Sequence, residues 1–153
     1  MTASTAAISL IERVIFLRQV PLFAALAPAD LEHVAEIAEE RGYADGETIA
    51  AEGELGDELH IVVEGVVRVV QDREGSEHEL ARRTAGDGVG EMSLITHTPR
   101  MASLLASGLT RTLRIGRREF ESMLRERPDV ALAVMRVLAQ RLSEGVDRNP
   151  VAR

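Results

Sequence analysis

The chain has 153 residues, 45% hydrophobic and 28% charged, which is the composition of one globular domain with a packed core. A formal net charge of −7 argues against nonspecific binding to nucleic acid or anionic lipid, and no apolar run approaches the length of a membrane-spanning helix. There is no cysteine, which excludes disulfide scaffolds and thiolate metal sites. All 18 basic residues are arginine, which excludes lysine-dependent phosphate loops. With no secretory leader at the N-terminus, a cytoplasmic protein is predicted.

Two helices are predicted in the first third of the chain. Apolar residues recur at helical spacing over residues 8–18, after a flexible N-terminus of residues 1–7. A second helix begins at Pro28, a residue that suits the first helical turn. It is predicted to end at Arg41 and Gly42, because glycine is the usual stop.

The middle of the chain changes to short segments with a period of two, separated by glycines, which is typical of strands and tight turns. The predicted strands are residues 47–51, 59–63, 66–70, 79–83, 103–107 and 112–115. Many short strands of this kind indicate a barrel or a double-sheet jelly roll. The helical period returns after Gly116, first around Phe120 and then from Pro128 to a stop at Gly145. The predicted fold class is therefore mainly β with flanking α.

The segment richest in chemistry is residues 89–103, called the cassette segment below. Gly90 allows the backbone to approach another group closely, and the next residues are able to form one helical turn, whose free N–H groups favour an anion. Pro99 keeps the residue before it extended, so the chain swings back. Arg100 then supplies a planar fork of donors that suits phosphate. One carboxylate, Glu91, and one arginine on the same small loop suit a ligand with both a hydroxyl and a phosphate.

This segment resembles the phosphate-binding cassette of cyclic nucleotide-binding domains, the family of the catabolite activator protein and protein kinase A regulatory subunits. The matching residues are Gly-Glu-Met-Ser-Leu at 90–94 and Pro-Arg-x-Ala-Ser at 99–103, with nine residues from Glu91 to Arg100. Glycine and core positions at 43–49, 52–53, 59–67 and 86–87 also resemble the family.

The resemblance implies an eight-stranded jelly-roll (double-stranded β-helix) barrel with N-terminal helices and two C-terminal helices. Residues 8–145 would form the domain and residues 146–153 a tail. Glu91 would accept a hydrogen bond from a ribose hydroxyl, and Arg100 would bind the cyclic phosphate. The implied ligand-binding residues are Val89, Gly90, Glu91, Met92, Ser93, Arg100, Met101 and Ala102. The last helix would be a movable lid, with Arg141 as the candidate cap on the base.

Position 101 departs from the family pattern, in which a small or hydroxyl-bearing residue follows the arginine. A threonine there is linked to cyclic GMP preference, so Met101 predicts cyclic AMP in preference to cyclic GMP, with no other cofactor. Met101 also motivates an alternative, a degenerate domain that binds no nucleotide and acts as a protein-docking module. A second alternative is a cupin-like metal enzyme that uses His60 and His78, although the four histidines are isolated in the sequence.

The prediction is a regulatory module without enzymatic activity. Its output is expected to pass through an unidentified partner protein or a fused domain. The chain alone is not expected to bind nucleic acid or to insert into a membrane. The first and last helices are candidate surfaces for a homodimer.

Overall fold

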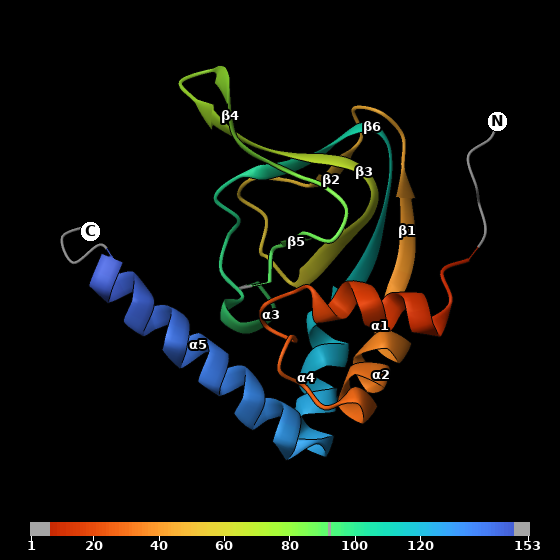
Figure 1. Cartoon of the computed structure of the whole chain (residues 1–153). Coiled ribbons are helices and arrows are strands. Elements are labelled where there is room, and N and C mark those ends of the chain that lie inside the picture. Colours follow the sequence, from red (N-terminus) through yellow and green to blue (C-terminus); the bar gives the residue numbers. More distant parts are fainter. Residues whose placement is uncertain (1–6, 92, 149–153) are drawn as a thin grey trace.

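The computed structural model describes residues 7–91 and 93–148, and a bent β-sheet stands above a layer of helices (Figure 1). The elements in chain order are α1 (Leu10–Arg18), α2 (Pro28–Ile37), β1 (Glu39–Tyr43), β2 (Thr48–Ala50), β3 (Glu58–Arg73), β4 (Ser76–Arg83), β5 (Gly88–Val89), α3 (Ser93–Thr96), β6 (Ser103–Gly116), α4 (Arg117–Glu126) and α5 (Pro128–Arg148). In these described ranges, no helix combines the length and apolar composition needed to cross a bilayer.

Both predicted N-terminal helices are present, and α1 begins at Leu10, two residues after its predicted start. The Ser9 side chain accepts a hydrogen bond from the Glu12 N–H at 3.2 Å, and the Glu12 carboxylate accepts one from the Ser9 N–H at 3.0 Å. This reciprocal cap satisfies two donors that the first turn of a helix leaves open. Pro28 occupies the first turn of α2 as predicted.

The predicted end of the second helix at Gly42 is wrong, because α2 stops at Ile37 and the next residues form β1. Ala38 is already extended, with ψ of 138°. β1 pairs antiparallel with β6, and opposite charges face each other across this pair. Arg114 binds Glu39 at 2.9 Å, and Arg111 binds Glu40 at 3.3 Å. The cross-strand partners lie more than 70 residues away in the sequence, so local periodicity does not reveal them.

The sheet has the strand order β1-β6-β3-β4, with β2 paired to β6 and β5 paired to β3. Six strands are described instead of the eight that the resemblance implies. Each of two predicted strand pairs forms one long strand, β3 or β6, and β1 and β5 were not predicted.

Gly65 explains why β3 continues where a turn was expected. Its φ of +89° lies in the left-handed region, and the pairing with β6 shifts register on both sides of Glu64. A Cβ at Gly65 would lie 2.4 Å from the Leu109 carbonyl oxygen, so only glycine fits this bulge. The glycine therefore bends the strand without ending it.

Two buried clusters form the core. One joins the helices to the sheet, and within it the rings of Phe23 and Phe120 meet edge to face with centroids 5.9 Å apart. The other lies within the sheet and contains Ala50, Val62, Val67, Val89 and Leu104. Because Val89 directly precedes the rest of the cassette segment, this second cluster anchors the start of that segment.

The C-terminal helix α5 extends from α4 as a long arm that stands apart from the sheet (Figure 1). Val130 and Val134 are buried at its beginning. Further along, Leu132, Met135 and Leu142 are 44%, 56% and 72% exposed. The helix passes through Gly145 to Arg148, so the predicted stop at Gly145 is wrong. The predicted flexible residues 1–7 lie, apart from Ala7, outside the described residues.

Candidate functional site

The cassette segment begins on the sheet and leaves it at once. Val89 of β5 pairs with His60 of β3. Gly90, with φ of +83°, then turns the chain away from the strand. The Leu94 N–H donates to the Glu91 carbonyl at 3.2 Å, and the Leu94 side chain is fully buried. This buried leucine fixes the short helix α3 against the core.

The segment returns by pairing with the loop between β2 and β3. The Arg100 N–H donates to the Glu54 carbonyl at 2.8 Å, and the Gly53 N–H donates to the Arg100 carbonyl at 2.9 Å. A third bond joins the Gly56 N–H to the Thr98 carbonyl at 2.9 Å. The backbone on both sides of Pro99 is therefore held, and the side chain of Arg100 projects from a fixed position.

The guanidinium of Arg100 has no carboxylate partner among the described residues. Its Nη2 donates to the backbone carbonyl of Glu58 at 3.2 Å, and the residue is half-buried. A cation in this position is satisfied only in part, because a neutral carbonyl makes a weaker hydrogen bond with it than an anion does.

A pocket of about 400 Å³ opens beside Arg100, within the range of small-molecule sites. Its walls come from β3, β4, β5, β6 and the cassette segment. The lining residues are Val69, Gln71, Leu80, Val89, Gly90, Thr96, Thr98, Pro99, Arg100, Met101, Ala102 and Leu104. The pocket thus combines aliphatic walls with one arginine, which suits a ligand that has both a flat apolar part and an anionic part.

Five predicted site residues meet in this pocket: Val89, Gly90, Arg100, Met101 and Ala102. Of the other predicted residues, Glu91 is not among those that line it. Glu91 follows Gly90 and is half-buried, with its Oε2 atom shielded from solvent. Met92 lies outside the described residues. Ser93 begins α3 and Arg141 lies on α5, but the side chains of both are outside the described part of the chain.

The sequence did not single out Gln71 and Leu80, which also line the pocket. The Gln71 amide donates to the Met101 carbonyl at 2.9 Å and ties β3 to the cassette segment. Leu80 is 47% exposed on β4, among mostly charged and exposed neighbours. A leucine in such a strand is the signal that could have marked it, because a solvated strand has no need of a large apolar side chain.

A buried polar cluster lies behind the Arg100 contact. His60 is 1% exposed, with its Nε2 3.1 Å from Glu58 Oε1 and its Nδ1 3.1 Å from the hydroxyl of Thr112. The other carboxylate oxygen of Glu58 binds Arg114. The hydrogen bond to His60, with further help from Arg114, holds the pKa of Glu58 at about 2 despite the opposing effect of burial. The cluster therefore fixes the position of Glu58, whose backbone carbonyl accepts the hydrogen bond from Arg100.

The two histidines of the cupin-like alternative are apart. His60 pairs with Arg114 of β6, whereas His78 of β4 pairs with Gln71. Within residues 7–91 and 93–148, no three histidine, aspartate or glutamate residues gather in a way that could hold a metal.

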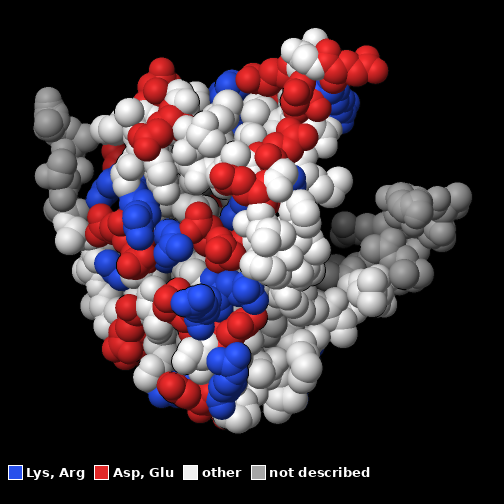
Figure 2. All heavy atoms as spheres, turned by 180° about the vertical axis from the view of Figure 1, so that it is seen from behind, with Lys and Arg blue, Asp and Glu red and all other residues white. Residues whose placement is uncertain are grey.

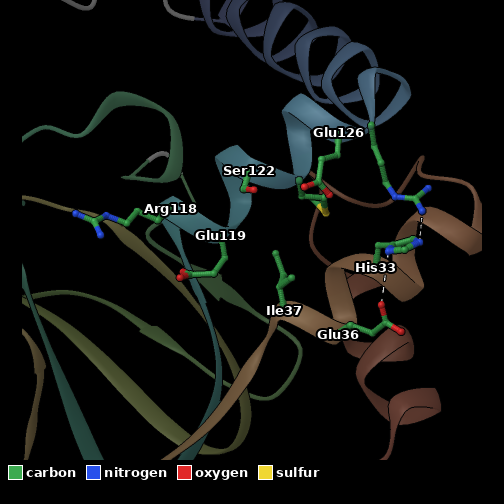
Figure 3. Close-up of a pocket in the computed structure, with 9 residues that line it drawn as sticks. His33, Glu36, Ile37, Arg118, Glu119, Ser122 and Glu126 are labelled. Atoms are coloured by element: carbon green, nitrogen blue, oxygen red, sulfur yellow. Dashed lines mark hydrogen bonds and ion pairs between the residues drawn. The ribbon is translucent and has the colours of Figure 1, made fainter.

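A different hollow of about 370 Å³ lies between α2 and α4 (Figure 3). His33 and Glu36 lie at 3.5 Å on one side, and Glu126 and Ser122 project from α4 on the other. It contains none of the predicted site residues.

Comparison with known proteins matches residues 40–127 to the cyclic nucleotide-binding domain. The chain is 35% identical over 125 residues to the cyclic AMP receptor protein of Thermus thermophilus, covering 81% of this chain and 58% of the relative. It is 30% identical over 116 residues to a cAMP-dependent protein kinase regulatory subunit of Blastocladiella emersonii, covering 75% of this chain and 29% of the relative. The chain thus spans less than two thirds of each of these curated relatives.

Solved structures give the same family. The N-terminal domain of a transcriptional regulator from Streptomyces coelicolor A3(2) superposes with a TM-score of 0.82 at 34% identity, covering 86% of this chain and 95% of that one. The regulatory domain of Toxoplasma gondii protein kinase A, crystallised with cAMP, gives a TM-score of 0.72 at 26% identity, with coverage of 88% and 50%. The chain therefore belongs to the cyclic nucleotide-binding domain family, as a non-catalytic regulatory domain related to the catabolite activator protein and protein kinase A regulatory subunits.

Proposed function

We propose that the chain is a regulatory module that binds cyclic AMP in the pocket beside Arg100. The observation that carries this proposal is the half-buried Arg100 guanidinium, which lines the pocket and contacts a backbone carbonyl in place of a carboxylate. A cyclic phosphate would displace the Glu58 carbonyl, because an anionic oxygen attracts a guanidinium more strongly than a neutral carbonyl does and a phosphate is able to accept two parallel hydrogen bonds from it.

Other residues of the cassette segment would supply the remaining contacts with the nucleotide. Backbone N–H groups of Met92, Ser93 and Ala102 would complete the phosphate cradle, and the Glu91 carboxylate would accept a hydrogen bond from the ribose. Val89 would form a wall against the sugar. Relatives named for cyclic AMP binding support this choice of ligand, among them the cyclic AMP receptor protein of Thermus thermophilus and the Toxoplasma gondii domain crystallised with cAMP.

Cyclic AMP is favoured over cyclic GMP because position 101 offers no hydroxyl to a guanine. Met101 is 78% exposed at the pocket and presents a flexible apolar side chain in its place. Leu80, also exposed at this pocket, offers a second apolar contact for a base.

Ligand binding would close α5 over the base by a shift of population between an open and a closed arrangement. In the structure α5 stands apart from the sheet (Figure 1). Met135 on α5 and Met101 at the pocket are both exposed. Closure would bury such apolar surfaces together, which is favourable. Arg141, the residue before the exposed Leu142 on α5, is the candidate cap on the base.

The finer architecture belongs to the same proposal. β3 and β6, each counted as two strands on either side of its bend, would bring the sheet to an eight-stranded jelly roll over a domain of residues 8–145. The acidic, cysteine-free composition favours the cytoplasm. The output would pass to a partner protein or a fused domain, and a homodimer through the helices remains a candidate assembly.

Calorimetric titration of the purified chain with cyclic AMP, and separately with cyclic GMP, tests the proposal. Saturable one-to-one binding of cyclic AMP, tighter than that of cyclic GMP, is expected. Tighter binding of cyclic GMP would contradict the choice of ligand. An absence of heat and of thermal stabilisation with either nucleotide would contradict the function and favour the protein-docking alternative.

A further inference from the structure

A second pocket, of about 390 Å³, lies where the cassette segment meets the junction of β6 and α4. Three arginines, Arg114, Arg117 and Arg118, line it together with His97. Figure 2 shows arginine and acidic side chains interleaved across the middle of the face seen from behind.

This pocket is separate from the one beside Arg100. The two hollows share no lining residue. Thr96 and Thr98 line the Arg100 pocket, whereas His97 between them lines the other. Successive residues of the cassette segment therefore face two different sites.

Two buried nitrogen atoms at this pocket have no hydrogen-bond partner among the described residues. They are Nε of Arg117 and Nδ1 of His97. The guanidinium of Arg117 binds Glu121 at 2.9 Å through Nη1, so its Nε–H is left over. Buried donors are nearly always satisfied in folded proteins, so these atoms indicate a ligand group that this chain does not itself supply.

Arg118 adds a positive charge that nothing described here neutralises, because it forms no ion pair with a residue in 7–91 or 93–148. Arg118 also lines the hollow between α2 and α4, where Figure 3 shows its guanidinium pointing away from His33 and Glu36. The pocket also contains Gly116, the N-cap of α4, and no side chain caps this ten-residue helix. The start of a helix carries a partial positive charge that favours anions.

Two carboxylates, those of Asp57 and Glu119, line the same pocket. Arg114 is already paired with Glu39 and Glu58, and Arg117 with Glu121, so among the described residues the arginine of this pocket without an ion pair is Arg118. Carboxylates accept hydrogen bonds from hydroxyl groups, and arginine forks bind phosphate oxygens. We propose that this pocket is a second ligand site, which binds a small phosphate-bearing anion through Arg117, Arg118 and His97.

The test uses inorganic phosphate and pyrophosphate as probes at constant ionic strength. It is made on the Arg100→Ala protein, so that the phosphate position of the first pocket does not contribute. Imidazole nitrogen resonances are followed by NMR, with His97 assigned by His97→Asn, a residue that tolerates its φ of +50°. A saturable shift of the His97 signal is expected.

Arg118→Ala is expected to weaken this binding by at least about tenfold, since one charge-assisted hydrogen bond is lost. Arg118 has no ion-pair partner within the described ranges, so the variant is expected to fold. Arg125→Ala is the matched control, because Arg125 lies on the same helix but does not line the pocket. It is expected to bind like its parent.

The proposal is overturned if the His97 signal does not saturate, or if Arg125→Ala weakens binding as much as Arg118→Ala. Either result would mean that the change in the His97 signal comes from general ionic screening and not from binding at this pocket. Because the nucleotide titration above is made without these probes, its failure and the failure of this second site are distinguishable.

Discussion

Arginines on the sheet and in the cassette segment have different partners. Arg111 binds Glu40 at 3.3 Å and Glu64 at 2.9 Å, and Arg114 binds Glu39 and Glu58. The guanidinium of Arg100 instead donates to the backbone carbonyl of Glu58 and has no carboxylate partner among the described residues. Paired arginines connect strands, whereas an arginine that lines a pocket without a carboxylate remains available for an anion. Partners, more than residue type, therefore separate structural from functional arginine in this chain.

The most direct test of this difference removes one arginine of each kind and compares the two variants. Arg100→Ala is expected to weaken cyclic AMP binding by about 100-fold, since a bidentate contact to phosphate is worth roughly 3 kcal/mol. Its stability to urea is expected to change little. Calorimetry and urea unfolding on the same preparations measure the two effects. Arg111→Ala is the control and should lower stability with little effect on affinity. Loss of affinity in both variants would mean that the distinction is false.

Arg114→Ala examines the structural side of the comparison. Its removal leaves the Glu58 carboxylate, 18% exposed, with His60 as its ion-pair partner, and leaves Glu39 paired with Arg41. We expect a loss of about 2 kcal/mol in the free energy of unfolding, below the range for fully buried pairs because the site is partly solvated. Chemical denaturation at neutral pH measures it. Arg41→Ala, which removes one exposed ion pair with Glu39, should cost less than about 0.5 kcal/mol.

The pH dependence of stability tests the same cluster without removing an arginine. The pKa of Glu58 is lowered from 4.5 to about 2, first by the hydrogen bond to His60. A lowered pKa in the folded state adds stability above pH 4.5, and that contribution disappears as the pH falls from 4.5 toward 2. We expect about 1.5 kcal/mol from this residue after allowing for solvent screening. Unfolding measured between pH 2 and 6 gives the slope.

Glu58→Gln should flatten that slope, because the amide does not titrate. Glu77→Gln is the matched control, since Glu77 is 54% exposed and pairs with a single arginine. An unchanged slope in the Glu58 variant would place the acid sensitivity elsewhere in the chain.

Local signals predicted much of the fold. The helical spacing of apolar residues over 8–18, and Pro28, indicated the first two helices, and the alternation between residues 47 and 115 predicted most of the strands. The prediction failed where distant contacts override local preference. Gly65 was interpreted as a turn, but the carbonyl of Leu109, 44 residues later, makes it the centre of a bulge in one strand.

The candidate site divides in the same way. The part that lies on one continuous stretch, from Val89 to Ala102, was predicted from its motif, and most of it lines one pocket. Gln71 and Leu80 were missed, because their place at the pocket depends on the register between β3 and β4. The hydrogen bond from Arg100 to the Glu58 carbonyl joins residues 42 positions apart, so local sequence patterns could not predict it either.

The smallest expected effect concerns whether α5 belongs to the pocket region. Leu142 is 72% exposed, so Leu142→Ser should leave the stability of the nucleotide-free chain unchanged. If α5 closes over the bound nucleotide, the variant loses part of a buried leucine, about 1 kcal/mol, and affinity for cyclic AMP falls about fivefold. Leu109→Ser is the control, since Leu109 is 60% exposed beside the Gly65 bulge. Equal affinities in the two variants would mean that the pocket works without α5, and that Arg100 and the cassette segment bind the nucleotide alone.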